Sequence, residues 1–209
     1  MRFITFSTAQ DPSPRLALRT ESGLRGLSSA NAARAPQSLL ELIASGSAAM
    51  REAAGAIEQL GDPIDPADII HLPPVLAPAK IICVGLNYLD HTKESKFEQF
   101  DYEGEMVAFI GRGGKHISKS SALEYVAGYS VSNEGSVRDY QFKSPQWTVG
   151  KNFDRSGSIG PEFVSADELP PGGAGLKIET RLNGETVQSS NTSDMVFDLA
   201  TVVSLVSEA

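Results

Sequence analysis

Asp101-Tyr102-Glu103-Gly104-Glu105 is followed at once by the apolar run Met106-Val107-Ala108-Phe109-Ile110. In a β-strand, residues two apart point to the same face, so Glu103 and Glu105 present two carboxylates side by side. When two like charges are partly buried, their repulsion is relieved by protonation of one group or by a cation between them. The apolar run predicts that this strand enters a core, which favours a divalent cation. Taken alone, the Glu-x-Glu pattern is also typical of a solvated strand face.

The composition limits the class of protein. A chain of 209 residues can bury one hydrophobic core and a small second domain, and its 19 glycines and 12 prolines favour a turn-rich, mostly β protein. The net charge of −8 argues against a nucleic-acid-binding surface, so we expect small-molecule partners. Because the chain has no apolar run of membrane-spanning length, no signal-peptide pattern and a single cysteine, Cys83, we expect a cytoplasmic protein without membrane contacts or disulfides.

The N-terminal part, residues 1–61, is predicted to be a small α/β domain that caps the rest. Short apolar runs predict two strands, and apolar residues at helical spacing predict a helix that is weakened at Gly46 and Gly55. The predicted elements are strands at Met1–Phe6 and Arg15–Arg19 and a helix over 37–60.

Residues 62–79 are predicted to be an extended connection between two domains. Five prolines in this segment fix φ and remove hydrogen-bond donors: Pro63, Pro66, Pro73, Pro74 and Pro78. The next segment, Lys80–Leu86, is predicted to be a buried strand with Cys83 as a small core residue. A second domain then occupies residues 80–209, and the fold class is α+β, mostly β.

Four further elements are predicted in this second domain: a helix at Ser118–Ala127, a strand at Tyr129–Asn133, a hairpin over 177–188 and a helix at Met195–Val206. Gly128 suits the C-cap of the first helix, and Asp194 suits the N-cap of the last. Asn183-Gly184 is a strong signal for the hairpin turn. The strand ends where it would deliver Glu134.

Glu134 would join Glu103 and Glu105 as a third oxygen ligand. Three carboxylates without sulfur or imidazole suit Mg²⁺ or Mn²⁺ better than zinc, and Ca²⁺ accepts the same ligands. His91 and Glu94 lie three residues apart, so on a helix the carboxylate can orient the imidazole as a general base. The same spacing is also typical of a surface salt bridge.

Two basic residues are candidates for substrate contacts. Lys151 lies between glycine-containing stretches and can place a cation beside an oxyanion or a substrate carboxylate. Arg138, followed by Asp139, allows two interpretations: an internal ion pair, or an arginine fork that binds a substrate carboxylate.

These motifs follow one another in a fixed order: Val84–Tyr88 with His91 and Glu94, then Asp101–Glu105, Ala127–Gln141, Gln146–Lys151, Asn183–Glu185 and Ser190–Met195. The order resembles the fumarylacetoacetate hydrolase family, which includes acylpyruvate hydrolases, oxaloacetate decarboxylases and 2-oxohept-3-ene-dioate hydratase/isomerases. The resemblance covers about residues 80–209. It implies a rolled, mixed β-structure for the catalytic domain and a homodimer.

The resemblance also implies roles for particular residues. The implied metal ligands are Glu103, Glu105 and the acid at position 134. His91 and Glu94 would activate water on a lid element. Contact with a diketo acid is implied for three residues: Lys151, Arg138 and Gln141.

The implied activity is metal-dependent hydrolysis of a C–C bond in 2,4-diketo acids of the acylpyruvate type, with Mg²⁺ or Mn²⁺ as Lewis acid. Oxaloacetate decarboxylation and hydratase/isomerase activity on 2-oxo diacids are alternatives within the family. An alternative of another class is a non-catalytic protein that binds a metal and a keto acid.

Three features depart from the family pattern. Most relatives have Asp where this chain has Glu134, whose extra methylene requires a backbone shift or a changed ligation mode. Relatives carry a longer segment, with a Phe-x-Lys stretch, where only Ser95–Phe100 lie between the His-x-x-Glu and Asp101. The chain also ends at Ala209 without the Gly-Thr-Pro-x-Gly-Val-Gly loop that closes the pocket. We expect the last two differences to correspond to a mobile lid and tail of a longer protein.

Overall fold

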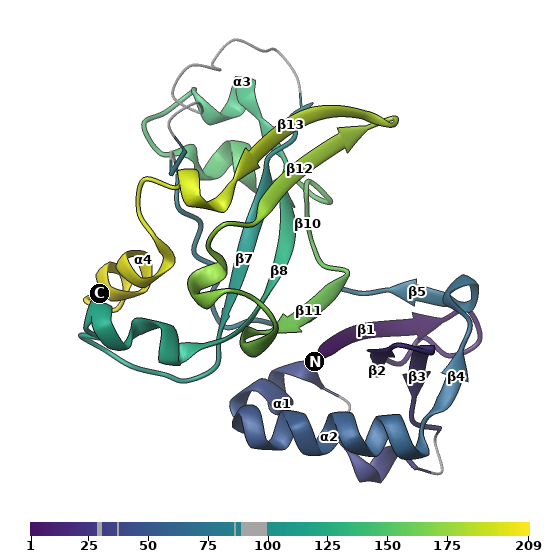
Figure 1. The fold of residues 1–209 in the computed structure, drawn as a ribbon. Helices are drawn as coiled ribbons and strands as arrows, with labels where there is room; N and C mark the ends of the chain where they lie inside the picture. Colours follow the sequence, from purple (N-terminus) through teal and green to yellow (C-terminus); the bar gives the residue numbers. More distant parts are fainter. Residues whose placement is uncertain (29–30, 37, 86, 89–99) are drawn as a thin grey trace.

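A computed structural model describes residues 1–28, 31–36, 38–85, 87–88 and 100–209, and it is mostly β with short helices (Figure 1). The strands are β1 Arg2–Thr8, β2 Arg15–Thr20, β3 Gly23–Gly26, β4 Asp62–Ile64, β5 Ile69–His71, β6 Phe100–Asp101, β7 Gly104–Ile110, β8 Val126–Glu134, β9 Ser136–Val137, β10 Gly157–Ile159, β11 Glu162–Ser165, β12 Lys177–Leu182 and β13 Glu185–Asn191. The α-helices are α1 Leu39–Ala44, α2 Gly46–Leu60, α3 Arg138–Gln141 and α4 Leu199–Val206. Short 3₁₀ helices include η4 Lys119–Tyr125, η5 Trp147–Lys151 and η8 Thr192–Asp194. No helix within these ranges is long and apolar enough to cross a membrane.

One large sheet runs through the described chain. Its strand order is β10-β8-β11-β1-β2-β3-β4, with β5 added to β1 and β7 added to β8. Two small sheets, β12-β13 and β6-β9, lie outside it. All pairings between the described strands are antiparallel. The sheet is therefore continuous from the N-terminal strands to the pair β7-β8, which carries two of the predicted acidic residues and ends beside the third.

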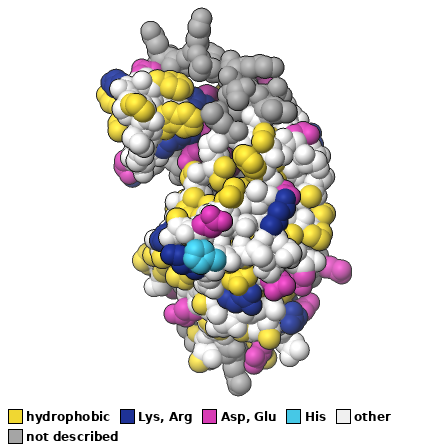
Figure 2. Space-filling model, turned by 90° about the vertical axis from the view of Figure 1, so that its left-hand side faces the viewer, with side chains coloured by type: hydrophobic (Ala, Val, Ile, Leu, Met, Phe, Trp, Pro, Cys, Tyr) yellow, Lys and Arg dark blue, Asp and Glu magenta, His cyan; other side chains and the backbone are white. Residues whose placement is uncertain are grey.

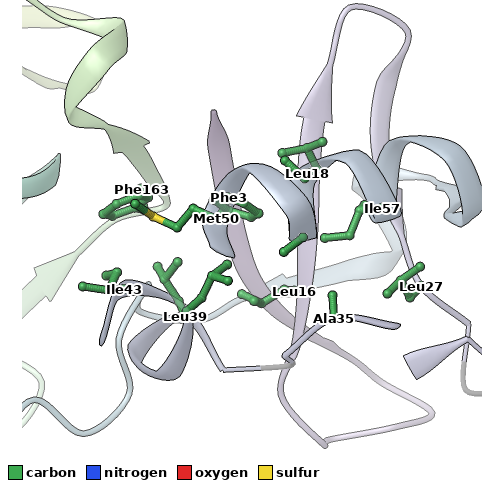
Figure 3. Close-up of a cluster of buried hydrophobic side chains, with 13 residues drawn as sticks. Phe3, Leu16, Leu18, Leu27, Ala35, Leu39, Ile43, Met50, Ile57 and Phe163 are labelled. Carbon is green, nitrogen blue, oxygen red and sulfur yellow. The ribbon is translucent and has the colours of Figure 1, made fainter. Parts of the chain in front are cut away.

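Helices α1 and α2 cover the N-terminal strands and enclose the largest hydrophobic core (Figure 1, Figure 3). Phe3, Leu42 and Ile57 come from β1, α1 and α2, and none is more than 1% exposed. Phe163 of β11 is fully buried in the same cluster, with its ring centroid 6.5 Å from that of Phe3. Because burial of such a side chain contributes about 1.5–3 kcal/mol, this core fastens the N-terminal elements to the strand next to β8.

The predicted strands near the N-terminus are confirmed, and the helix predicted over 37–60 is divided into α1 and α2. Gly46 stands at the division with φ +88°, a conformation that glycine adopts at little cost. Gly55, the second predicted weak point, lies within α2 without interrupting it.

The segment predicted to be an extended connection takes part in the sheet. Strand β4 pairs with β3, and β5 pairs with β1. The prolines in these pieces are tolerated because Pro63 lies on an edge strand and Pro66 begins a 3₁₀ turn.

The prediction of a buried strand at Lys80–Leu86 was wrong for its described part, Lys80–Gly85. This part forms no strand, and Ile81 and Ile82 are 63% and 58% exposed. Cys83 is exposed as well, so it is not a core residue. The apolar residues of this segment are typical of a strand. A strand also needs a hydrogen-bonded neighbour, however, and none of the described strands pairs with this segment.

Two predicted helix boundaries were also wrong. The first helix is the 3₁₀ helix η4, which ends at Tyr125, and Gly128 lies inside β8 instead of capping a helix. The last helix begins at Leu199, because Asp198 is its N-cap and accepts a hydrogen bond from the Thr201 amide. Asp194 instead completes a capping box with Asn191 in η8.

Two glycine-to-alanine substitutions should have opposite effects on stability. A Cβ added at Gly128 would lie 2.4 Å from the Phe163 ring and from the Val164 carbonyl oxygen, so Gly128→Ala should cost about 1–3 kcal/mol through overpacking. At Gly55 no atom lies within 4 Å of the added Cβ, so Gly55→Ala should stabilise α2 by about 0.5–1 kcal/mol. Chemical denaturation measures both, and a Gly128→Ala variant at least as stable as the parent would contradict the packing described for Gly128.

Candidate metal centre

Three acidic residues converge at one end of the β7-β8 pair. Gly104 of β7 pairs with Asn133 of β8, so Glu103 just before β7 faces Glu134 at the end of β8. The Glu134 amide donates to the Glu103 carbonyl oxygen at 2.9 Å. The Glu103 amide donates to the Asn133 side-chain oxygen at 3.0 Å. The main chain at Glu103 is therefore fixed from β8.

The carboxylates of Glu103, Glu105 and Glu134 come close enough to share one ion. One oxygen from each lies within 4.8 Å of the others. Glu103 is buried, at 7% exposure, and the other two are partly buried. Carboxylate oxygens are the donors that Mg²⁺, Mn²⁺ and Ca²⁺ prefer, so this set fits a hard divalent cation. The structure also shows that the longer Glu134 side chain reaches the cluster.

Lys151 supplies positive charge within this cluster. Its Nζ donates to Glu103 Oε1 at 2.6 Å and to Glu134 Oε2 at 3.0 Å. Gly150 makes this position possible, because a Cβ there would lie 2.5 Å from the main-chain nitrogen of Gln141. The glycine thus lets η5 pack closely on α3 and directs the following lysine to the acids.

Arg138 forms internal ion pairs, but its partners are not Asp139. Its Nε and Nη2 donate to Asp101 Oδ2 at 3.0 and 2.8 Å, and its Nη1 donates to Glu103 Oε1 at 2.7 Å. The same Nη1 also donates to the Gln141 side-chain oxygen at 2.8 Å. Arg138 and Gln141, which were both expected to contact substrate, therefore make contacts that hold Glu103.

The pKa of Glu103 is lowered even though the group is buried. Burial, the largest influence, would raise it, but hydrogen bonds from Lys151 and Ser136 and the charges of Lys151 and Arg138 together outweigh that influence. Ser136 is fully buried, and its hydroxyl donates to Glu103 Oε1. Glu103 is thus held as a carboxylate by three donors on one oxygen.

The pKa of Glu105 is raised to about 7. Burial is the main cause, and the charges of Glu134 and Glu103 add to it, while Lys151 opposes them. The cluster therefore carries more negative charge than its basic neighbours neutralise, and a bound divalent cation would favour the ionised form of Glu105.

Three residues near the site were not singled out from the sequence as site residues: Asp101, Ser136 and Cys83. Asp101 and Ser136 lie within the motifs around the predicted ligands, and their proximity to those ligands was the available signal. Nothing in the sequence placed Cys83 here. Although Cys83 is exposed as a residue, desolvation of its thiol beside the cluster raises the pKa to about 12, and the neighbouring Glu134 and Glu105 contribute. His91 and Glu94, the predicted base pair, lie outside the described residues.

Comparison with known proteins finds a family model and individual relatives that match this chain. The family model described as "Fumarylacetoacetate (FAA) hydrolase C-terminal" matches residues 95–209. The rat protein named "Oxaloacetate tautomerase Fahd2a, mitochondrial" is 34% identical over 242 residues, which cover all of this chain and 76% of the rat protein. Since the chain has 209 residues, the rat protein carries residues inside the aligned region that this chain lacks.

Solved structures of other proteins are similar to this chain in fold. The fumarylacetoacetate hydrolase of Exiguobacterium antarcticum is 28% identical with a TM-score of 0.81, over 99% of this chain and 81% of that one. A maleylpyruvate hydrolase from Sphingobium sp. SYK-6, solved with manganese(II) and pyruvate, is 21% identical with a TM-score of 0.81, over 100% of this chain and 83% of that one, and so shows the shared fold. The α+β, mostly β fold class, predicted from composition and from the family resemblance, is confirmed.

The raised pKa of Glu105 predicts a pH-dependent effect of Glu105→Gln on stability. Without metal, a group whose folded pKa is raised from 4.5 to about 7 stabilises the fold at low pH and loses that contribution as the pH rises through this range. Glutamine stays neutral, so the melting temperature of the variant relative to the parent should increase between pH 4.5 and 8.

The measurement is a series of thermal melts in EDTA. Glu185→Gln, at an exposed position on the β12-β13 hairpin, controls for the loss of one negative charge. A difference between Glu105→Gln and the parent that stays constant with pH would show that the pKa of Glu105 is not raised in the folded protein.

Proposed function

Because the chain belongs to the fumarylacetoacetate hydrolase family, we propose that it is a divalent-metal-dependent enzyme that interconverts the keto and enol forms of small 2-oxo acids such as oxaloacetate. Enzymes of this family include hydrolases, isomerases and tautomerases. The observation that carries the proposal is the cluster of three carboxylates with the Lys151 ammonium among them. The name of the 34% identical rat protein favours oxaloacetate as the substrate.

Glu103, Glu105 and Glu134 are the residues that would hold the cation. A bound Mg²⁺ or Mn²⁺ would act as a Lewis acid and orient the 2-oxo acid end of the substrate. The solved maleylpyruvate hydrolase with manganese(II) and pyruvate supports this assignment by analogy of fold.

Lys151 would stabilise the transition state. When a proton leaves C3 of the 2-oxo acid, negative charge builds up on the 2-oxo oxygen, and an ammonium beside the carboxylate cluster can offset that charge. Water takes the C3 proton and a proton is returned to the oxygen, so the C3–H bond and the C2=O π bond are exchanged for a C2=C3 double bond and an O–H bond, and no C–C bond is broken. Arg138 would act through Glu103, which it contacts directly. The direct substrate contacts predicted for Arg138 and Gln141 remain predictions.

Hydrolysis of a C–C bond in a 2,4-diketo acid is the second candidate function. The solved fumarylacetoacetate hydrolase, 28% identical over nearly the whole chain, favours it. This reaction requires an activated water as well as a stabilised enolate. His91 and Glu94 would supply the base, and Lys151 would keep the same role.

We also propose that the protein is a homodimer. Large hydrophobic side chains are exposed on the described surface, including Ile81, Ile82 and Val84 in one short segment. Figure 2 shows hydrophobic side chains in several groups among acidic and basic ones on one face. Exposed groups of this kind are typical of association surfaces.

The homodimer predicts a sedimentation result. In analytical ultracentrifugation the protein should sediment with about twice its chain mass of 22.3 kDa and should dissociate on dilution. A species with the mass of one chain at every concentration would exclude the dimer.

Lys151→Met should lower kcat for enol-oxaloacetate by about 10²–10³-fold, because it removes the charge beside the developing oxyanion. The assay follows the loss of the enol's ultraviolet absorbance with Mn²⁺ present, corrected for the spontaneous reaction. Lys115→Met removes an exposed lysine and serves as the matched control.

Two further assays separate the candidate functions. Loss of the acetylpyruvate diketone absorbance, abolished by His91→Ala, would identify the hydrolase, and pyruvate formed from oxaloacetate would identify a decarboxylase. Metal binding without turnover of any of these acids would leave a non-catalytic binding protein and contradict the enzymatic proposal.

A further inference from the structure

The β12-β13 hairpin contacts the acidic cluster through one glutamine. The amide of Gly104, the residue between Glu103 and Glu105, donates to Gln188 Oε1 at 2.9 Å. Gln188 Nε2 donates to the Gly104 carbonyl oxygen at 3.4 Å. Figure 1 shows the hairpin lying beside β7. Both main-chain groups of Gly104 thus bond to one side chain, which takes the place of a neighbouring strand.

Thr180 holds that glutamine from the opposite strand of the hairpin. Thr180 pairs with Gln188 in register, and its hydroxyl donates to Gln188 Oε1 at 2.9 Å. The approach is close enough to require glycine on β7, because a Cβ at Gly104 would lie 2.2 Å from the Thr180 hydroxyl and 3.0 Å from Gln188 Oε1. The glycine within the Glu-x-Glu motif therefore leaves the space that Thr180 and Gln188 of the hairpin occupy.

Gly104 would otherwise be the weakest point of the cluster. Glycine has the most freedom of any residue in its main chain, and here it joins two carboxylates that lie within 4.8 Å of each other and of a third. Like charges at this separation repel, and this repulsion would move the main chain on the two sides of Gly104 so that the carboxylates separate. On the β8 side, the Asn133 side chain and the Glu134 amide fix Glu103. On the other side of β7, Gln188 fixes Gly104.

We infer that Gln188 is a positioning residue for the metal centre: its side chain, oriented by Thr180, holds the main chain at Gly104 so that Glu103 and Glu105 converge with Glu134. This inference rests on the proposed function, which assigns a divalent cation to the three carboxylates. Gln188 acts only through the main chain of β7, so its loss should weaken metal binding without removing a ligand.

The test compares Mn²⁺ binding by the full chain and its variants. Gln188→Met keeps the length of the side chain but removes both hydrogen bonds, and it should weaken Mn²⁺ affinity by about tenfold to a hundredfold, as loss of groups that orient metal ligands does. Thr186→Val removes a hydroxyl from an exposed position on the same hairpin and should leave the affinity within twofold of the parent. Electron paramagnetic resonance of free Mn²⁺ gives the dissociation constants, and melting temperatures in EDTA report folding.

Thr180→Val provides a second variant that keeps the shape of the side chain. It should weaken Mn²⁺ affinity less than Gln188→Met does, and the double variant should be no weaker than Gln188→Met alone, because both changes act through one contact. Independent, additive losses would overturn the arrangement in which Thr180 orients Gln188.

The outcomes separate this inference from the proposed function. If the parent binds Mn²⁺ and Gln188→Met binds it equally well, whatever its melting temperature, the positioning role is wrong and the metal centre stands. If the parent binds no Mn²⁺, the proposed function and this inference both fail.

Discussion

The mutual repulsion of three carboxylates is the constraint on which this structure depends. Glu103, Glu105 and Glu134 lie within 4.8 Å of one another in a partly buried place, and water cannot fully screen charges there. The protein offsets part of this repulsion with Lys151 and Arg138, which both contact Glu103. At Glu105, burial together with the charges of Glu134 and Glu103 outweighs the influence of Lys151 and raises the pKa to about 7. A site with this remaining negative charge is ready for a divalent cation.

The main chain around the acids is fixed from both sides. Pairing with β8 sets the register that brings Glu134 opposite Glu103, and Gln188 from the hairpin bonds to Gly104 between the other two acids. Asp101 holds Arg138 in place against Glu103. Three of the motifs, Asp101–Glu105, Ala127–Gln141 and Gln146–Lys151, therefore meet in one spatial arrangement, where they supply the three carboxylates and the basic groups that contact them.

Sequence reasoning succeeded where the signal is local. The Glu-x-Glu pattern, the strand that ends at Glu134 and the Asn183-Gly184 turn were each predicted from a few adjacent residues, and the structure contains all of them. It failed where the local structure depends on residues that are distant in the sequence. Lys80–Gly85 has the composition of a buried strand but no strand beside it, and Gly128 serves close packing against Phe163 instead of ending a helix.

By itself, the sequence identified three carboxylates as candidate ligands of a hard cation, because carboxylates without sulfur or imidazole suit few other metals. It also determined the family, through the order of its motifs. Only the tertiary structure decided what each basic residue does: Arg138 pairs with Asp101 and Glu103, and not with Asp139 beside it. The physical reason is that an ion pair or a hydrogen bond depends on distance in space, and β7, β8, η5 and the hairpin come together only when the sheet has formed.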